Sequence, residues 1–120
     1  MSVPKLAVAL ALIAFALPAF AEPKAYELVR YRGKAAGLTI AFDFGAGYPE
    51  ASEVRIAKAG ARLSRKFRLD DSGEMRFVPV KDRSGADEVS LKMSPYDQPE
   101  KVEGVHRAGG KTLPFRLTEQ

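Results

Sequence analysis

The stretch LTIAFDF, residues 38–44, has a large apolar side chain at every second position. Successive side chains of a β-strand point to opposite faces, so the apolar residues of this stretch fall together on one face of an extended segment. Small or polar residues occupy the positions between them. The stretch therefore predicts a β-strand with one buried face, and it is the clearest strand signal in the chain.

The same period of two recurs on both sides of this stretch, and no window of ten or more residues beyond the N-terminal segment keeps a helical period. The fold class that we predict is all-β: a single antiparallel meander of about seven or eight short strands forming a small sandwich or barrel, with sequential strands as neighbours. The further expected strands are AYELVRYRG (25–33), EVRIAK (53–58), ARLSRKFRLD (61–70), EMRFVPV (74–80), EVSLKMS (88–94) and the runs from Val102 and from Thr112.

Local patterns predict details of these strands and turns. In residues 61–70, Leu63 shares the parity of Phe67, so both are expected on the dry face. The turn Asp70–Gly73 combines acidic side chains that bond their own backbone with a glycine free to take positive φ. Gly33 and Gly37 are expected to frame a turn, and Pro79 predicts a bulge or an edge position.

Residues 1–21 differ from the rest of the chain. Lys5 is followed by the apolar run LAVALALIAFAL (6–17), Pro18 and the small-residue site Ala19-Phe20-Ala21. This order is typical of a cleaved secretory signal peptide, and the run is shorter than the roughly 20 residues of a membrane-spanning helix. We therefore expect cleavage after Ala21, a single all-β domain over residues 22–120, no transmembrane anchor and a periplasmic or secreted protein.

Composition narrows the possible chemistry. The chain has no cysteine, which excludes thiol catalysis, disulfides and thiolate metal sites. The formal net charge of +4 is mild and its signs are interspersed, unlike the strongly basic surface of a nucleic-acid-binding domain. A modest positive charge still permits contact with anionic surfaces.

The catalytic inventory is small. His106 is the only histidine, so the chain holds no two-histidine metal site, and we interpret it as a solvent-exposed hairpin residue. Met75 and Met93 could bind Cu(I) together with His106, but both lie on apolar faces and favour core packing. The adjacent Asp70 and Asp71 are explained by turn chemistry. We therefore expect no enzyme activity, no catalytic residues, no metal and no cofactor.

A basic face is the strongest binding signal. Arg62, Lys66 and Arg68 share one parity of a predicted strand, and Arg76 on the next strand is expected near them across the Asp70–Gly73 turn. Such a face suits lipid phosphates, lipopolysaccharide or an acidic protein. The alternative interpretation is a solvated face that protects the sheet against edge pairing.

The closing residues VEGVHRAGGKTLPFRLTE (102–119) resemble the last two strands of small secreted bacterial β domains, including those that precede some α/β-hydrolases. The matching positions include Gly104, the Gly109-Gly110 pair and Pro114-Phe115. The resemblance implies a fold and no activity. The Gly-Gly pair predicts a two-residue hairpin turn, and Pro114 predicts an edge or a bulge.

A second resemblance is to periplasmic lysozyme inhibitors, whose inhibitory loop carries Ser-Gly followed by an aromatic residue, loosely matched here by Ser72, Gly73 and Phe77. Our functional hypothesis is an exported binding or accessory protein, whose partner is an unidentified protein or envelope component, with an anionic lipid surface among the options. The alternatives are an inhibitor of a cell-wall hydrolase and a small envelope hydrolase that uses Asp70, Asp71 or His106.

Overall fold

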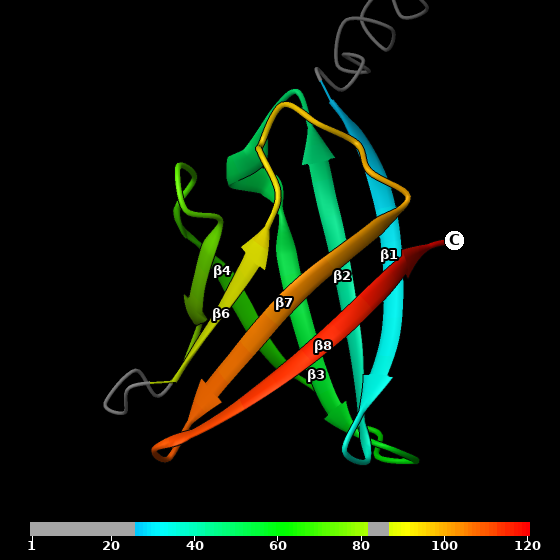
Figure 1. Cartoon of the computed structure of the whole chain (residues 1–120), viewed down its shortest axis with the longest axis vertical. Coiled ribbons are helices and arrows are strands. Elements are labelled where there is room, and N and C mark those ends of the chain that lie inside the picture. Colours follow the sequence, from blue (N-terminus) through cyan, green and yellow to red (C-terminus); the bar gives the residue numbers. More distant parts are fainter. Residues whose placement is uncertain (1–25, 82–86) are drawn as a thin grey trace, which may run out of the picture.

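The computed structural model describes residues 26–81 and 87–120. The expected signal peptide, residues 1–21, and residues 82–86 of the polar loop lie outside the described residues. The described strands run antiparallel in chain order and form a closed barrel, which confirms the all-β meander (Figure 1). They are β1 (Glu27–Ala35), β2 (Leu38–Ala46), β3 (Glu53–Lys58), β4 (Arg65–Asp71), β5 (Arg76–Pro79), β6 (Glu88–Lys92), β7 (Lys101–Ala108) and β8 (Lys111–Glu119).

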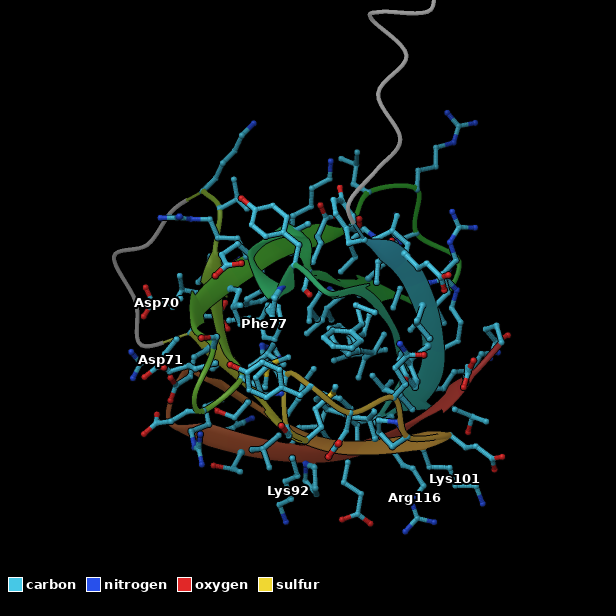
Figure 2. The ribbon with its side chains drawn as sticks, turned by 90° about the horizontal axis from the view of Figure 1, so that it is seen from above. Asp70, Asp71, Phe77, Lys92, Lys101 and Arg116 are labelled. Atoms are coloured by element: carbon cyan, nitrogen blue, oxygen red, sulfur yellow. The ribbon has the colours of Figure 1, made fainter. Side chains whose placement is uncertain are left out.

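The interior of the barrel is a packed core of aromatic and aliphatic side chains. Phe42 is fully buried, with its ring 5.5 Å from that of Tyr31 and 5.7 Å from that of Phe77. An eight-stranded barrel is about wide enough for its own side chains to fill, and Figure 2 shows the interior occupied in this way. The predicted faces of β2 and β3 are confirmed, since Phe42, Phe44 and Val54 are buried.

The prediction for Leu63 is wrong. β4 begins only at Arg65, so Leu63 lies in the connection from β3, where it is 86% exposed. Within β4 the expected alternation does hold, because Phe67 is buried while Lys66 and Arg68 face solvent. Parity with a buried residue predicts burial only as far as the strand itself extends.

Two-residue turns with positive φ join β1 to β2 and β7 to β8. Gly109 and Gly110 have φ of 58° and 76°, as predicted for the closing hairpin. The first turn is formed by Ala36 and Gly37, with φ of 49° and 78°. Gly33 instead lies within β1, which corrects the predicted turn boundary.

The β4–β5 turn follows the predicted chemistry only in part. The Asp71 carboxylate accepts a hydrogen bond from the Gly73 backbone N–H at 2.9 Å, as expected for an aspartate in a turn. The positive φ falls on Met75, at 47°, rather than on Gly73. The strand register also shifts between Leu69 and Asp71, so the bulge is on β4 and not at Pro79.

Both strand prolines lie where a neighbouring strand is missing. β6 pairs with β5 only at Arg76 and Phe77, so Pro79 extends beyond this ladder. Pro114 lies on β8 in a part that β1 does not reach, since β1 and β8 pair only at Tyr31↔Glu119 and Arg32↔Thr118. Proline lacks a backbone donor and is tolerated at such edges, which confirms the edge predictions.

The barrel is closed by the end of β8. Gln120 donates its backbone N–H to the Arg30 carbonyl at 2.9 Å, and Glu119 donates to the Glu100 carbonyl at 2.8 Å. Gly33 allows the close approach of β8, because a Cβ at this position would lie 2.2 Å from the Arg116 carbonyl oxygen. The β1–β8 seam is therefore short and depends on a glycine.

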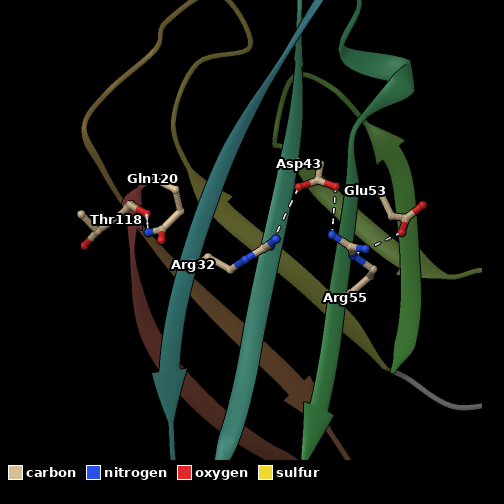
Figure 3. A network of polar contacts seen from close by, with 6 residues as sticks. All are labelled: Arg32, Asp43, Glu53, Arg55, Thr118 and Gln120. Carbon is tan, nitrogen blue, oxygen red and sulfur yellow. Dashed lines mark hydrogen bonds and ion pairs between the residues drawn. The ribbon is translucent and has the colours of Figure 1, made fainter. Parts of the chain in front are cut away.

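Ion pairs link the outer faces of the first three strands (Figure 3). Asp43 on β2 accepts a hydrogen bond from Arg55 on β3 at 2.9 Å, and its other oxygen lies 4.0 Å from Arg32 on β1. Arg55 also lies 3.6 Å from Glu53. Asp43 therefore bridges both neighbouring strands on the solvent side of the sheet.

Candidate functional site: a cationic end of the barrel

The meander brings alternate connections to the same end of the barrel. The β1–β2, β3–β4 and β7–β8 connections lie at one end, at the lower edge of Figure 1, and β5 ends and β6 begins toward the same end. The Ala59 N–H donates to the Gly37 carbonyl at 2.9 Å, which ties the β3–β4 connection to the β1–β2 turn. We call this end the cationic end because of the side chains that it carries.

Exposed basic side chains gather at the cationic end from every strand pair that turns there. The acidic residues described at this end are Asp87 and Glu88, and both form ion pairs with arginines. The result is a surface with a clear excess of positive charge. Its basic residues are Lys34, Lys58, Arg62, Arg65, Lys66, Lys81, Arg107 and Lys111.

The opposite end has the reverse balance. The β2–β3, β4–β5 and β6–β7 connections and the strand ends beside them are rich in carboxylates. The basic residues Arg76, Lys92 and Lys101 also lie toward this end. The charge of the barrel is thus separated along its length, although its sum is small. The acidic residues are Glu27, Glu50, Glu53, Asp70, Asp71, Glu74, Asp97 and Glu100.

Most of the basic side chains at the cationic end are not neutralised by an ion pair. Arg65 is bound by Asp87, and Arg107 lies 3.4 Å from Glu88. The others make no ion pair with any residue in the described ranges, 26–81 and 87–120. They are Lys34, Lys58, Arg62, Lys66, Lys81 and Lys111. Among the described residues, these six charges therefore have no internal counter-ion.

The structure separates the four residues of the predicted basic face. Arg62 and Lys66 lie at the cationic end, and both are exposed. Arg68 is exposed farther along β4, opposite Glu53 of β3.

Arg76 lies at the start of β5, near the carboxylate-rich end. It donates a hydrogen bond to Asp70 at 2.8 Å and lies 3.9 Å from Glu88. The bond to Asp70 raises the pKa of Arg76, and the neighbouring carboxylates add to this effect. Arg76 is therefore engaged within the chain and is not part of the cationic end.

A hollow of about 410 Å³ lies beside the start of β4 at the cationic end. Its lining combines three basic side chains with the Ser64 hydroxyl and the half-exposed Val80. Ammonium, guanidinium and hydroxyl groups are all hydrogen-bond donors, so this lining suits anionic oxygens. The lining residues are Ser64, Arg65, Lys66, Val80 and Lys81.

A second hollow, of about 460 Å³, lies where β8 diverges from β1. Lys34, Lys92 and Arg116 line it, but Glu103 lies among them and binds Arg116 at 3.0 Å. Figure 2 shows Lys92 and Arg116 pointing outward from the same side of the barrel. Because this wall carries its own counter-charge, it is a weaker candidate for an anion than the hollow beside β4.

The interpretation of His106 as a solvent-exposed hairpin residue is wrong. Its side chain is only 14% exposed, and its Nε2 lies 2.9 Å from Asp87 Oδ1. Its ring meets Phe67 edge-on, with centroids 5.8 Å apart. Asp87 also binds Arg65, whose guanidinium lies over the Phe67 ring at 5.7 Å. The missed signal is strand parity, because Val102, Gly104 and His106 share the inward face of β7.

This cluster holds the start of β4 against β6 and β7. The Asp87 side chain is 9% exposed and accepts from both Arg65 and His106, which satisfies a nearly buried carboxylate. The arrangement fixes the position of Arg65, which lines the hollow beside β4. We assign the cluster a positioning role at the cationic end.

The remaining candidates are used within the fold. Met75 is fully buried and Met93 packs against the core, as expected from their apolar faces. Asp70 binds Arg76, and Asp71 caps the turn at Gly73. Within the described part of the chain, no group of three His, Asp or Glu side chains has the geometry to hold a metal ion.

The likeness to lysozyme inhibitors is not supported at its aromatic position. Phe77 is fully buried in the barrel core, so it is not a surface residue of a loop. Ser72 and Gly73 do lie in the β4–β5 turn, but Phe77 lies in β5 and points into the core, so its ring is not exposed beside them.

Comparison of the chain with protein-family models, with curated proteins and with solved structures found no match. Within residues 26–81 and 87–120, no helix has both the length and the apolar character needed to cross a membrane.

Proposed function

We propose that the protein is an exported binding or accessory domain that contacts an anionic component of the bacterial envelope through its cationic end. The observation that carries the proposal is the concentration of exposed lysines and arginines at this end, most of them without an ion pair among the described residues. The secretory pattern of residues 1–21 supports export to the periplasm or the medium.

The expected strength of this contact follows from the number of charges. A Lys or Arg close to an anionic membrane surface contributes about 1 kcal/mol, and the attraction decays over a Debye length of about 8 Å at physiological salt. Several such residues at one end of the barrel give useful affinity even though the net charge of the chain is only +4. The position of the charges is therefore more important than their sum.

The test compares two triple variants that remove the same formal charge from different places. One carries Arg62→Ser, Lys66→Ser and Lys81→Ser at the cationic end. The control carries Arg30→Ser, Lys92→Ser and Lys101→Ser, all exposed positions away from that end. Binding of the mature protein to vesicles of phosphatidylglycerol and phosphatidylcholine, and to soluble polyphosphate, is measured by sedimentation and by calorimetry.

We expect the first variant to lose about 100-fold in affinity for an anionic partner, from three contributions of about 1 kcal/mol, while the control stays within a few-fold of wild type. Binding of the wild type should also weaken as salt is raised. Equal losses in the two variants would show that only net charge is important and would contradict the proposal.

A further inference from the structure

The β3–β4 connection presents a large exposed apolar side chain at the cationic end. Leu63 is 86% exposed, and Arg62, Arg65 and Lys66 are its close neighbours in the chain. Val80, 46% exposed, lies in the lining of the adjacent hollow. Exposing a leucine side chain to water is unfavourable. Leu63 lies outside the strands and does not pack against the core, so the fold does not account for a leucine at this position.

The combination of an apolar tip with surrounding cations distinguishes between classes of anionic partner. A soluble polyanion offers negative charge to Arg62 and Lys66 but no apolar phase to Leu63. An anionic bilayer offers both, because its phosphates lie directly above the acyl chains. Basic residues around an apolar side chain are therefore more complementary to a membrane surface than to a free polymer.

The hollow beside β4 adds a place for a lipid phosphate. Ser64, Lys66 and Lys81 bring donors to a space of about 410 Å³, next to the loop that carries Leu63. Arg65, which is held by Asp87, forms a fixed part of the same wall. A phosphate oxygen in this hollow would receive charge-assisted hydrogen bonds while Leu63 enters the lipid beside it.

We propose that the barrel docks end-on to an anionic phospholipid bilayer, with Leu63 inserted at the boundary between headgroups and acyl chains and with Lys66 and Lys81 on lipid phosphates. This inference rests on the proposed function, since it names the anionic component as a lipid bilayer. In this orientation the barrel axis is roughly perpendicular to the plane of the bilayer, and the carboxylate-rich end faces away from the membrane.

The test uses Leu63→Ser and the matched control Tyr96→Ser. Tyr96 is 91% exposed in the β6–β7 connection, at the opposite end. Each variant is measured on vesicles of phosphatidylglycerol and phosphatidylcholine and on soluble polyphosphate. We expect Leu63→Ser to bind the vesicles about tenfold more weakly and polyphosphate as well as wild type, while Tyr96→Ser matches wild type on both.

A spectroscopic reading gives an independent measure of insertion. The chain contains no tryptophan, so Leu63→Trp introduces a single reporter, with Tyr96→Trp as its control. We expect the emission of the Leu63→Trp variant to shift to the blue when anionic vesicles are added, and that of the control to stay unchanged. Circular dichroism of each variant establishes that the barrel is intact.

The outcomes separate the two proposals. Wild-type binding to polyphosphate but not to vesicles, equal vesicle binding by Leu63→Ser and wild type, or an unshifted Leu63→Trp emission on bound vesicles each overturns the docking inference alone. A loss of Leu63→Ser binding to both probes also overturns it, because Leu63 would then act without a lipid phase. If the wild type binds neither probe, the proposed function itself fails.

Discussion

Tyr31 links the interior of the barrel to the β6–β7 connection. Its ring stacks on Phe42 in the core, and its hydroxyl donates to the Pro99 carbonyl at 2.6 Å. Burial raises the pKa of Tyr31 above its ordinary value of 10.0, and the negative charge of Glu119 raises it further. The folded protein therefore favours the neutral phenol, which is the form that can donate this hydrogen bond.

The raised pKa of Tyr31 predicts a loss of stability in alkali. The stabilisation is fully present below about pH 10, where the unfolded tyrosine is also protonated, and it is lost as pH rises through the folded pKa. Tyr31→Phe should lower the free energy of unfolding by about 1 kcal/mol at neutral pH and should weaken the alkaline dependence. Urea unfolding between neutral and strongly alkaline pH measures both effects.

Tyr96→Phe is the matched control for Tyr31→Phe, because Tyr96 is 91% exposed and donates no hydroxyl bond to the described part of the chain. It should keep both the neutral stability and the alkaline dependence of wild type. An unchanged pH profile in Tyr31→Phe would contradict the assignment of this dependence to Tyr31.

Among the elements, β1 and β8 pair over a short seam near the end of β8, at Tyr31↔Glu119 and Arg32↔Thr118. Gly33 makes the contact possible, because an added Cβ would lie 2.2 Å from the Arg116 carbonyl oxygen and 2.7 Å from a Leu117 methyl group. The first of these neighbours is backbone, which cannot rotate away as a flexible side chain can. A side chain at this position would therefore push β8 away from β1.

Gly33→Ala should lower the free energy of unfolding by about 1–3 kcal/mol, the usual cost of overpacking. Gly73→Ala is the control, because its Cβ would meet only the Asp71 carboxylate at 3.4 Å. Urea unfolding of the two variants gives the comparison. A Gly33→Ala variant as stable as Gly73→Ala would show that β1 and β8 do not close the barrel at this point.

At the scale of the whole molecule, the hydrogen-bonded ladders of the barrel are uneven. β2 pairs along its length with β1 and over most of it with β3, whereas β5 and β6 pair only at Arg76↔Ser90 and Phe77↔Val89. Local opening follows the weakest packing and pairing in a fold. β1 and β8 also pair at only two positions, but β8 packs closely against Gly33 of β1, so the barrel should open first between β5 and β6.

Native-state hydrogen exchange tests this order of opening. The Leu91 N–H, which donates to the Met75 carbonyl at 3.0 Å beside the β5–β6 seam, should exchange faster than the amides of Ile40 and Phe42 on β2. Equal protection factors at these positions would indicate that the barrel opens only as one unit.

Sequence patterns predict the strands well because each strand must bury one face. The alternation over residues 38–44 and 53–58 is directly visible, and the Gly109-Gly110 turn follows from its need for positive φ. The predicted burial of Leu63 is wrong because periodicity does not mark the residue at which β4 begins. The contact between Asp87 and His106 could not be predicted, because it depends on the β6–β7 register, which no local pattern contains.

The cationic end shows a different limit. Lys34, Lys66, Lys81 and Lys111 are far apart in the chain, and only the meander places them at one end. A predicted meander does contain a usable signal, because its alternate connections must lie together. Comparing the charges of odd and even connections would have indicated this concentration of basic residues, whereas the parity of one strand grouped Lys66 with Arg68, which lies farther along β4.

The separation of charge also gives the barrel a large permanent dipole moment for a small net charge. In the field of a negatively charged surface, such a molecule experiences a torque before it makes any contact. Rotational diffusion is then biased, so that a larger fraction of encounters begin with the basic connections leading. The distance over which this preorientation acts is set by the Debye length, which becomes shorter as ionic strength rises. The rate of productive encounter should therefore fall with added salt.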